Sequence, residues 1–451
     1  MRQRVTGAQR RTSSSNRQGT PGRSTRATMA LARLGLVWMA PALIGLAGVQ
    51  AAQAAAQGPQ RANWVNSWQG SPTQGATFDT KSCPSDVGVQ DQTVRNIVYL
   101  STGGDHIRVR VSNAGGTAPL RIGAASVAPS SGDGPGLEGD ARALHFGGAQ
   151  AIVVPAGGEA LSDVIDLPVK PLDALAISVY LPAKTGPATQ HFLATQTSYL
   201  SDGNQAAGGA AVAFTRPVSC WMFVSGVDVD AAPSVKGTLV TLGDSITDGY
   251  MSSAGKNRRF PDDLGRLLSE RKGATLAVSN AGVTGNELLT NREQAMFGVP
   301  VGERLARDVL TQPGLRAVVF LEGINDIGDK SAKADDVIQA MQQVITQVHA
   351  SGARIYGGTL LPFMGSNATY HADYGTPAGE QERLKVNEWI RTSHAFDGVI
   401  DFDKATRDPA KPDQMLAQFD SGDHLHPSDA GYEAMAHAVD VDAIMAGLGR
   451  H

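Results

Sequence analysis

The spacing of hydrophobic residues changes about halfway along this 451-residue chain. From about residue 62 to residue 230, apolar and polar residues alternate, as in DHIRVRVSN, where Ile107, Val109 and Val111 are separated by arginines. Stretches rich in Gly, Pro, Ser and Asp, such as APSSGDGPGLEGD, divide these runs. Alternation with a period of two and frequent turns are typical of short antiparallel strands. The pattern predicts a β-sandwich or jelly-roll-like domain.

The segment Asp228–Gly237 is predicted to be a linker, because the pattern changes after it. Continuous apolar runs now alternate with segments of helical spacing, and a last helix is expected over 428–447. Strands that are apolar throughout are expected where helices cover both faces of a parallel sheet. The sequence therefore predicts a three-layer α/β/α domain over residues 231–451, preceded by the β-sandwich domain over residues 55–230.

The N-terminus has the pattern of a targeting segment. The first 33 residues are basic and contain no acidic residue, and the apolar run Leu34–Ala52 and an Ala-x-Ala site at Ala52–Ala54 follow. This order is typical of a secretory signal peptide, so residues 1–54 are predicted to be a leader and the mature protein to be secreted or periplasmic. A membrane anchor is the alternative, which Pro41 disfavours. After cleavage we expect no stable membrane insertion. Met29 is an alternative start codon.

The net charge and the cysteine content limit the binding partners that we expect. The net charge of −4 gives no electrostatic reason to expect nucleic-acid binding. The two cysteines, Cys83 and Cys220, form either one disulfide or two buried thiols, and neither lies at metal-ligand spacing from a partner. We therefore expect no metal and no cofactor. The oligomeric state is left open.

Polar residues stand at the expected ends of three strands and before the last helix. They lie in the segments GDS (243–245), NAGVTGNE (280–287), EGINDIG (322–328) and DSGDHLHPSDAGY (420–432). Ligands of open α/β sheets bind at the carboxyl ends of the strands, where these segments would meet. The sequence therefore predicts a functional site there.

These segments contain the groups that nucleophilic acyl transfer requires. Ser245 supplies a hydroxyl, His426 a base, and Asp423 a carboxylate that can orient the base. His424 is the alternative base, although its position next to Asp423 would direct it elsewhere. Three groups are predicted to stabilise the oxyanion: the backbone N–H groups of Ser245 and Gly285 and the side-chain amide of Asn325.

Other polar residues receive structural interpretations. Asp244 and Asp326 are predicted to bond local amides, and the role of Asp248 is left open. The remaining histidines, His191 among them, show no partner at ligand spacing and are predicted to be ordinary surface or core residues. The loop at 360–377 either lines a substrate pocket or packs on the β domain.

The segments GDS, NAGVTG, GIND and DHLH, in this order, resemble the four blocks of the SGNH, or GDSL, hydrolase superfamily. The resemblance covers residue 239 to the C-terminus and places Ser245, Gly285, Asn325 and His426 on the four family letters and Asp423 on the triad acid. It implies a flavodoxin-like α/β/α fold and the hydrolysis of esters, thioesters or acyl groups on carbohydrates. The first block reads GDSI instead of GDSL.

The upstream segments NWVNSWQGSPTQ and RVRVSNAGGTAPL resemble the β-sandwich domain of two-domain secreted bacterial GDSL esterases. Together these observations predict a secreted serine esterase that acts on small-molecule or carbohydrate esters with short acyl groups. An acyltransferase with the same triad and a catalytically idle carbohydrate-binding protein are the alternatives.

Overall fold

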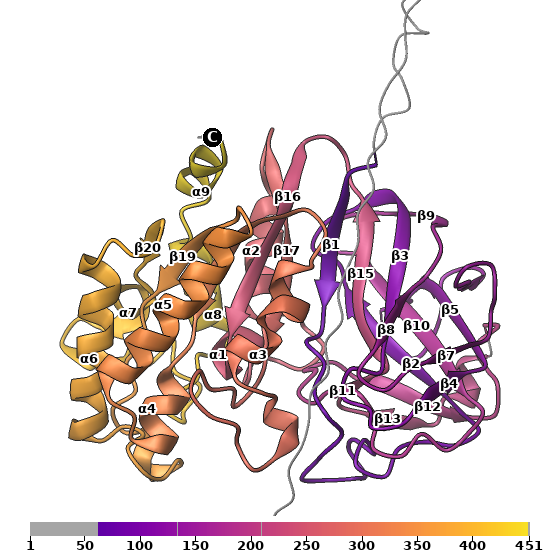
Figure 1. Ribbon diagram of the computed structural model, residues 1–451, viewed down its shortest axis with the longest axis horizontal. Coiled ribbons are helices and arrows are strands. Elements are labelled where there is room, and N and C mark those ends of the chain that lie inside the picture. The colour runs from indigo at the N-terminus through magenta and orange to yellow at the C-terminus, as the bar shows by residue number, and fades with distance from the viewer. Residues whose placement is uncertain (1–61, 133, 209, 450–451) are drawn as a thin grey trace, which may run out of the picture. The chain divides into compact units, whose positions relative to one another are not determined.

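Antiparallel strands make up the first half of the described chain (Figure 1). The computed structural model describes residues 62–132, 134–208 and 210–449, which belong to one compact unit. One sheet has the order β1-β15-β3-β8, with β9 also paired to β3, and a second has the order β13-β12-β2-β10-β5-β6.

The strands of the first sheet are β1 (Trp64–Gln69), β3 (Gly104–Ser112), β8 (Glu159–Leu161), β9 (Ile165–Val169) and β15 (Val224–Asp230). Those of the second are β2 (Gln92–Tyr99), β5 (Ala124–Pro129), β6 (Arg142–Ala143), β10 (Ala174–Leu181), β12 (Ser198–Asp202) and β13 (Arg216–Val218). Two small sheets pair β4 (Leu120–Ile122) with β7 (Ile152–Val154) and β11 (Gln190–His191) with β14 (Trp221–Met222).

The alternating pattern directs one face of each sheet into a shared core. Val109 and Val111 of β3 are fully buried and belong to the same hydrophobic cluster as Ile177 and Val179 of β10. In β3, Arg108 and Arg110 alternate with these buried residues and are only partly buried, as expected for a strand that packs one face on the core. The predicted β-sandwich is therefore confirmed.

A parallel sheet follows, with the order β17-β16-β18-β19-β20. Its strands are β16 (Val235–Gly243), β17 (Thr275–Gly282), β18 (Leu315–Leu321), β19 (Arg354–Gly358) and β20 (Gly398–Ile400). The second strand along the chain thus lies outside the first, and the third lies on the other side of the first. This is the flavodoxin-like order 2-1-3-4-5, and its switch point lies between β16 and β18.

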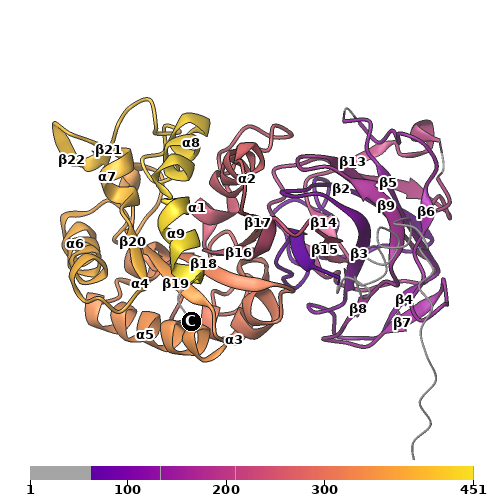
Figure 2. The same cartoon turned by 90° about the horizontal axis from the view of Figure 1, so that it is seen from above.

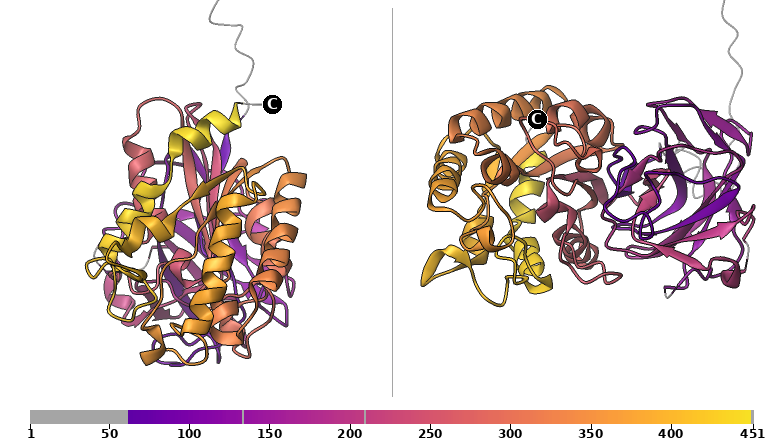
Figure 3. Two further views of the ribbon diagram at one scale, coloured as in Figure 1. Left: turned by 90° about the vertical axis from the view of Figure 1, so that its left-hand side faces the viewer. Right: turned by 90° about the horizontal axis from the view of Figure 1, so that it is seen from below.

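Helices cover both faces of the parallel sheet, with α2 and α8 on one side and α3 and α5 on the other (Figure 2, Figure 3). The helices are α1 (Ser245–Asp248), α2 (Phe260–Glu270), α3 (Val301–Leu305), α4 (Ile324–Lys330), α5 (Ala334–Ala350), α6 (Pro377–Thr392), α7 (Phe402–Thr406), α8 (Asp429–Ala438) and α9 (Val441–Leu448). A short hairpin, β21 (Arg407–Asp408) and β22 (Lys411–Met415), follows α7. The three-layer prediction is confirmed.

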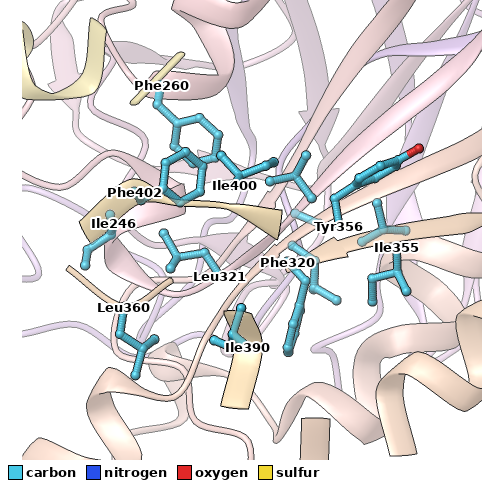
Figure 4. Close-up of a cluster of buried hydrophobic side chains, with 14 of the residues drawn as sticks. Ile246, Phe260, Phe320, Leu321, Ile355, Tyr356, Leu360, Ile390, Ile400 and Phe402 are labelled. Atoms are coloured by element: carbon cyan, nitrogen blue, oxygen red, sulfur yellow. The ribbon is translucent and has the colours of Figure 1, made fainter. Parts of the chain in front are cut away.

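The core of the parallel sheet is built from large apolar side chains of strands and covering helices (Figure 4). Phe260 of α2 and Phe402 of α7 are fully buried, and their ring centroids lie 5.6 Å apart. Phe320 of β18 lies in the same cluster. This packing fixes the strand ends from which the polar loops emerge.

Two local predictions need correction. The linker is only residues 231–234, because β15 runs to Asp230 and β16 already begins at Val235. The last helix is two helices, α8 and α9, because Val439 is extended and the Asp440 carboxylate caps α9 by accepting a hydrogen bond from the N–H of Ala443.

The described residues also bear on the termini and cysteines. Cys83 and Cys220 form a disulfide. The predicted leader lies outside the described residues, and the domain limits at 55–230 and 231–451 stay predictions. In the described part of the chain, no helix has the length and apolar character needed to cross a membrane.

Candidate active site

Ser245 is presented at the end of β16 by a tight turn. A Cβ on Gly243 would lie 2.3 Å from the carbonyl oxygen of Leu321, so the close approach of the two strand ends admits only glycine. The Asp244 carboxylate caps the following turn by accepting a hydrogen bond of 2.9 Å from the N–H of Ile246. Ser245 is thereby the first residue of the one-turn helix α1.

Three side chains form a linear chain of hydrogen bonds. The Oγ of Ser245 lies 2.8 Å from Nε2 of His426, and Nδ1 of His426 lies 2.8 Å from Oδ2 of Asp423. Because a carboxylate only accepts, Nδ1 carries the proton and Nε2 accepts from the serine hydroxyl. All three residues are buried. The structure thus brings together residues that are up to 181 positions apart.

The Asp423 carboxylate is held in its ionised form. Burial alone would raise its pKa, but the hydrogen bond and charge of His426 and the backbone N–H groups of Leu425 and His426 lower the pKa below its usual range. The hydroxyl of Tyr370 donates a further hydrogen bond of 3.0 Å to Oδ2 of Asp423. The ring of Tyr250 packs edge-on against the imidazole at a centroid distance of 4.7 Å. These contacts fix the orientation of the imidazole.

Gly285 and Asn325 lie in the loops after β17 and β18. Gly285 has a φ of +75°, and a Cβ there would lie 2.4 Å from the ring of Phe297, so conformation and space both require glycine. The amide of Asn325 accepts a hydrogen bond from Tyr374 at Oδ1 and donates one from Nδ2 to the carbonyl of Asn286. An amide nitrogen carries two hydrogens, so the second is available to a ligand.

These residues surround one cavity of about 510 Å³, which Ser245, His426, Gly285 and Asn325 all line. Tyr370 and Tyr374 line it as well, which answers the question left open for the loop at 360–377. The apolar part of its lining consists of Phe78, Phe192, Leu193, Phe297 and Leu425.

Asp248 connects the loop after β17 with the antiparallel region. Its Oδ2 accepts hydrogen bonds from the backbone N–H and the hydroxyl of Thr284, the residue before Gly285. Its Oδ1 lies 2.8 Å from Nε2 of His191, and Nδ1 of His191 lies 3.0 Å from the carbonyl oxygen of Ser71. Both ring nitrogens face groups that only accept, so the imidazole is doubly protonated. Burial lowers the pKa of His191, but the charge of Asp248 and the hydrogen bonds to Asp248 and Ser71 together outweigh burial and raise the pKa.

Several buried carboxyl groups lie beneath the site. Burial raises the pKa of Asp244 to about 7 and that of Glu287 to about 7, and it raises the pKa of Glu322 well above its ordinary value. Asp326 accepts hydrogen bonds from the N–H groups of Leu288 and Leu289. As predicted, Asp244 and Asp326 bond backbone amides, although those bonded by Asp326 belong to the preceding loop.

The structure separates the two candidate bases. Nδ1 of His424 lies 2.5 Å from Oδ2 of Asp420, and the side chain is half-exposed, so it points away from Ser245. Sequence reasoning missed other site residues: His191, Phe78 and Phe192 lie far from the motifs, and nothing in their sequence surroundings marks them. Tyr250 could have been found, since it ends the stretch GDSITDGY that begins at Gly243.

Comparison with known proteins agrees with this geometry. The sequence pattern of the GDSL-like Lipase/Acylhydrolase family matches residues 241–434. A search among curated proteins finds no match.

Solved structures with a similar chain path include a carbohydrate acetylesterase family member from Sinorhizobium meliloti (18% identity, 47% of this chain and 99% of that one, TM-score 0.37). Others are the aryl esterase of M. smegmatis (16%, 45% and 95%, TM-score 0.36) and a lipolytic G-D-S-L protein from Veillonella parvula (20%, 45% and 94%, TM-score 0.33). Likeness at this level carries no information on the substrate. By the family match over residues 241–434, the chain carries a hydrolase domain of the GDSL-like lipase/acylhydrolase family.

Proposed function

We propose that the protein is a secreted serine esterase that hydrolyses carboxylic esters through an acyl-enzyme on Ser245. One observation carries this proposal: the unbroken hydrogen-bond chain from Oγ of Ser245 through the imidazole of His426 to the carboxylate of Asp423. A buried serine hydroxyl in contact with an oriented imidazole is the arrangement that activates serine as a nucleophile.

In the first step, Oγ of Ser245 attacks the ester carbonyl carbon while its proton moves to Nε2 of His426. Asp423, which stays ionised, stabilises the resulting imidazolium. The carbonyl oxygen becomes an oxyanion that accepts hydrogen bonds from the N–H groups of Ser245 and Gly285 and from Nδ2 of Asn325. When this intermediate collapses, the bond to the alcohol breaks and the alcohol takes the proton from His426.

In the second step, water attacks the acyl-serine and gives its proton to His426. Collapse of the second intermediate releases the carboxylic acid and returns the proton to Oγ of Ser245. The same three donors stabilise both oxyanions, so removal of any one of them slows both steps.

Two further features support this proposal for the substrate and the location of the enzyme. A cavity of about 510 Å³ suits a small ester with a short acyl group, free or attached to a carbohydrate. Export is supported by the signal-like leader and by the Cys83–Cys220 disulfide, because disulfides persist in oxidising compartments. N-terminal sequencing of the mature protein tests export and should begin near residue 55.

The nucleophile is tested with Ser245→Ala and, as a matched control, Ser234→Ala, which changes an exposed serine in the turn before β16. We expect Ser245→Ala to abolish hydrolysis of p-nitrophenyl acetate and labelling by a fluorophosphonate. Ser234→Ala should keep both. Equal turnover by wild type and Ser245→Ala would overturn the proposal, and a fluorophosphonate adduct on another residue would assign the nucleophile elsewhere.

A further inference from the structure

The apolar wall of the cavity comes largely from outside the GDSL domain. Phe78 lies between β1 and β2, and Phe192 and Leu193 directly follow β11, so all three belong to the antiparallel region. They line the same cavity as Ser245 and His426. The antiparallel region therefore supplies part of the surface that a bound ester would touch.

Three of the wall residues form a continuous aromatic cluster. The ring centroids of Phe78 and Phe192 lie 6.0 Å apart at an interplanar angle of 81°, and those of Phe78 and Phe297 lie 6.0 Å apart at 55°. Phe297 in turn packs directly on Gly285. The cluster thus extends from the antiparallel region to the loop that carries a proposed oxyanion donor.

Phe78 is exposed yet held in place. Its side chain is 71% exposed, although a phenyl ring is stabilised by burial. The next residues form a turn in which the carbonyl of Asp79 accepts hydrogen bonds from the N–H groups of Ser82 and Cys83, and Cys83 is bonded to Cys220. An exposed apolar ring that lines a cavity and adjoins a hydrogen-bonded turn would be covered by a ligand bound there.

Two polar side chains of the cavity outside the catalytic set, Thr284 and Arg292, already have partners within the protein, whereas Gln294 is exposed. The hydroxyl of Thr284 donates to Asp248, and the guanidinium of Arg292 pairs with Asp329 at 3.1 Å and lies over the ring of Phe297. A sugar requires several free donors and acceptors, whereas an aromatic ring requires apolar surface and ring edges or faces. The residues that line the cavity therefore favour an aromatic ring over a sugar as the bound group.

We propose that Phe78, Phe192 and Phe297 form a subsite for an aromatic ring of the substrate, so that the antiparallel region contributes to the specificity of the esterase. This inference rests on the proposed esterase function. The ring can belong to the acyl or to the alcohol part of the ester, and the experiment separates these two sources.

The test uses pairs of esters that differ only in the aromaticity of the ring. Benzyl acetate and cyclohexylmethyl acetate probe the alcohol side, methyl benzoate and methyl cyclohexanecarboxylate probe the acyl side, and ethyl acetate serves as the ringless reference. Values of kcat/KM are measured for wild type, Phe78→Ala, Phe192→Ala and Phe78→Tyr. Val212→Ala is the control, because Val212 is an 85% exposed apolar residue of the antiparallel region that does not line the cavity.

We expect wild type to prefer the aromatic member of at least one pair. Phe78→Ala and Phe192→Ala should each lower this preference about fivefold, mainly through a higher KM, which is the scale of an aromatic pair interaction. Phe78→Tyr should restore most of the preference, and Val212→Ala should match wild type. The pair that responds identifies the side of the ester that carries the ring.

The inference is overturned if wild type hydrolyses ethyl acetate but shows no aromatic preference in either pair. It is also overturned if both alanine variants lower the kcat/KM values of all five esters by the same factor. Absence of any esterase activity in wild type would instead remove the proposed function itself, so the two failures are distinguishable.

Discussion

His191 and Asp248 form a buried ion pair, with Nε2 and Oδ1 2.8 Å apart, although 57 residues separate them in sequence. His191 belongs to the antiparallel region, whereas Asp248 ends the helix that begins with Ser245. Because Asp248 also binds the N–H of Thr284, the pair connects the antiparallel region to the loop of Gly285. Residues of both halves of the chain therefore help to position the loop that carries Gly285.

The first prediction concerns this pair. His191→Ala leaves the carboxylate of Asp248 buried without its cation, which should lower the free energy of unfolding by about 3 kcal/mol. The loop of Thr284 should also lose its fixed position, so kcat should fall while KM changes less. Urea unfolding and steady-state kinetics measure both effects.

His349→Ala is the matched control for this prediction. His349 and Asp397 form a pair with the same distance of 2.8 Å, but the histidine side chain is 42% exposed, so its loss should cost at most about 1 kcal/mol and leave kcat unchanged. Equal losses of stability in the two variants, with unchanged kcat in His191→Ala, would contradict a positioning role for the buried pair.

The second prediction concerns the orientation of the base. Asp423→Asn keeps the size of the side chain but removes the charge that stabilises the imidazolium, and it allows the wrong tautomer of His426. We expect kcat to fall by a factor of about 10⁴, the scale of this substitution in serine triads. Asp420→Asn, which alters the partner of the half-exposed His424, should retain kcat within about threefold. If Asp420→Asn is the more damaging change, His424 is the base.

Some residues of the site could be predicted from the sequence, and others could not. Ser245, Gly285 and Asn325 could be predicted to lie together because they follow parallel strands, whose carboxyl ends meet at one edge of the sheet. His426 follows no parallel strand and was predicted from its place before the last helix and from the Asp-x-x-His spacing. Phe78 and Phe192 could not be predicted, because an apolar residue in a strand-rich segment has the same pattern whether it faces the core or a cavity. Asp248 could not be identified as the partner of His191 from the sequence, because the two residues belong to different regions that meet only in the folded protein.

The architecture of both regions could also be predicted from the sequence, but one helix boundary could not. The change from period-two alternation to continuous apolar strands located both architectures, because each pattern reflects which faces of a strand are buried. The break between α8 and α9 was missed because the apolar spacing continues through it. The break is marked only by the Asp440 carboxylate, which accepts a hydrogen bond from the N–H of Ala443 and so begins a new helix.

The third prediction separates strain from steric contact at Gly285. Gly285→Ala imposes both a left-handed φ of +75° and a clash with Phe297, so it should destabilise the protein and lower kcat at least about tenfold. Gly273→Ala imposes a similar φ of +93° in a place with nothing within 4 Å. It should cost about 1 kcal/mol and leave kcat unchanged. Full activity of Gly285→Ala would show that this loop is not part of the oxyanion site.

The fourth prediction concerns the buried carboxyl group next to the nucleophile. Among the residues that the structure describes, Oδ2 of Asp244 has no hydrogen-bond partner, and burial raises its pKa to about 7. In the unfolded chain the pKa of an aspartate is ~3.9. Between these pH values the folded state holds a proton that the unfolded state releases, so the stability of wild type should fall as the pH rises from about 4 to about 7.

Asp244→Asn removes the contribution of this carboxyl group to the pH dependence of stability but keeps an oxygen that accepts from the N–H of Ile246. The variant and wild type should therefore be similarly stable near pH 4, whereas at pH 8 the variant should be more stable by up to about 4 kcal/mol. Urea unfolding at pH 4, 6 and 8 measures the difference. If the variant is less stable than wild type at pH 8, the Asp244 carboxylate is stabilised in the folded protein, which the unpartnered Oδ2 argues against.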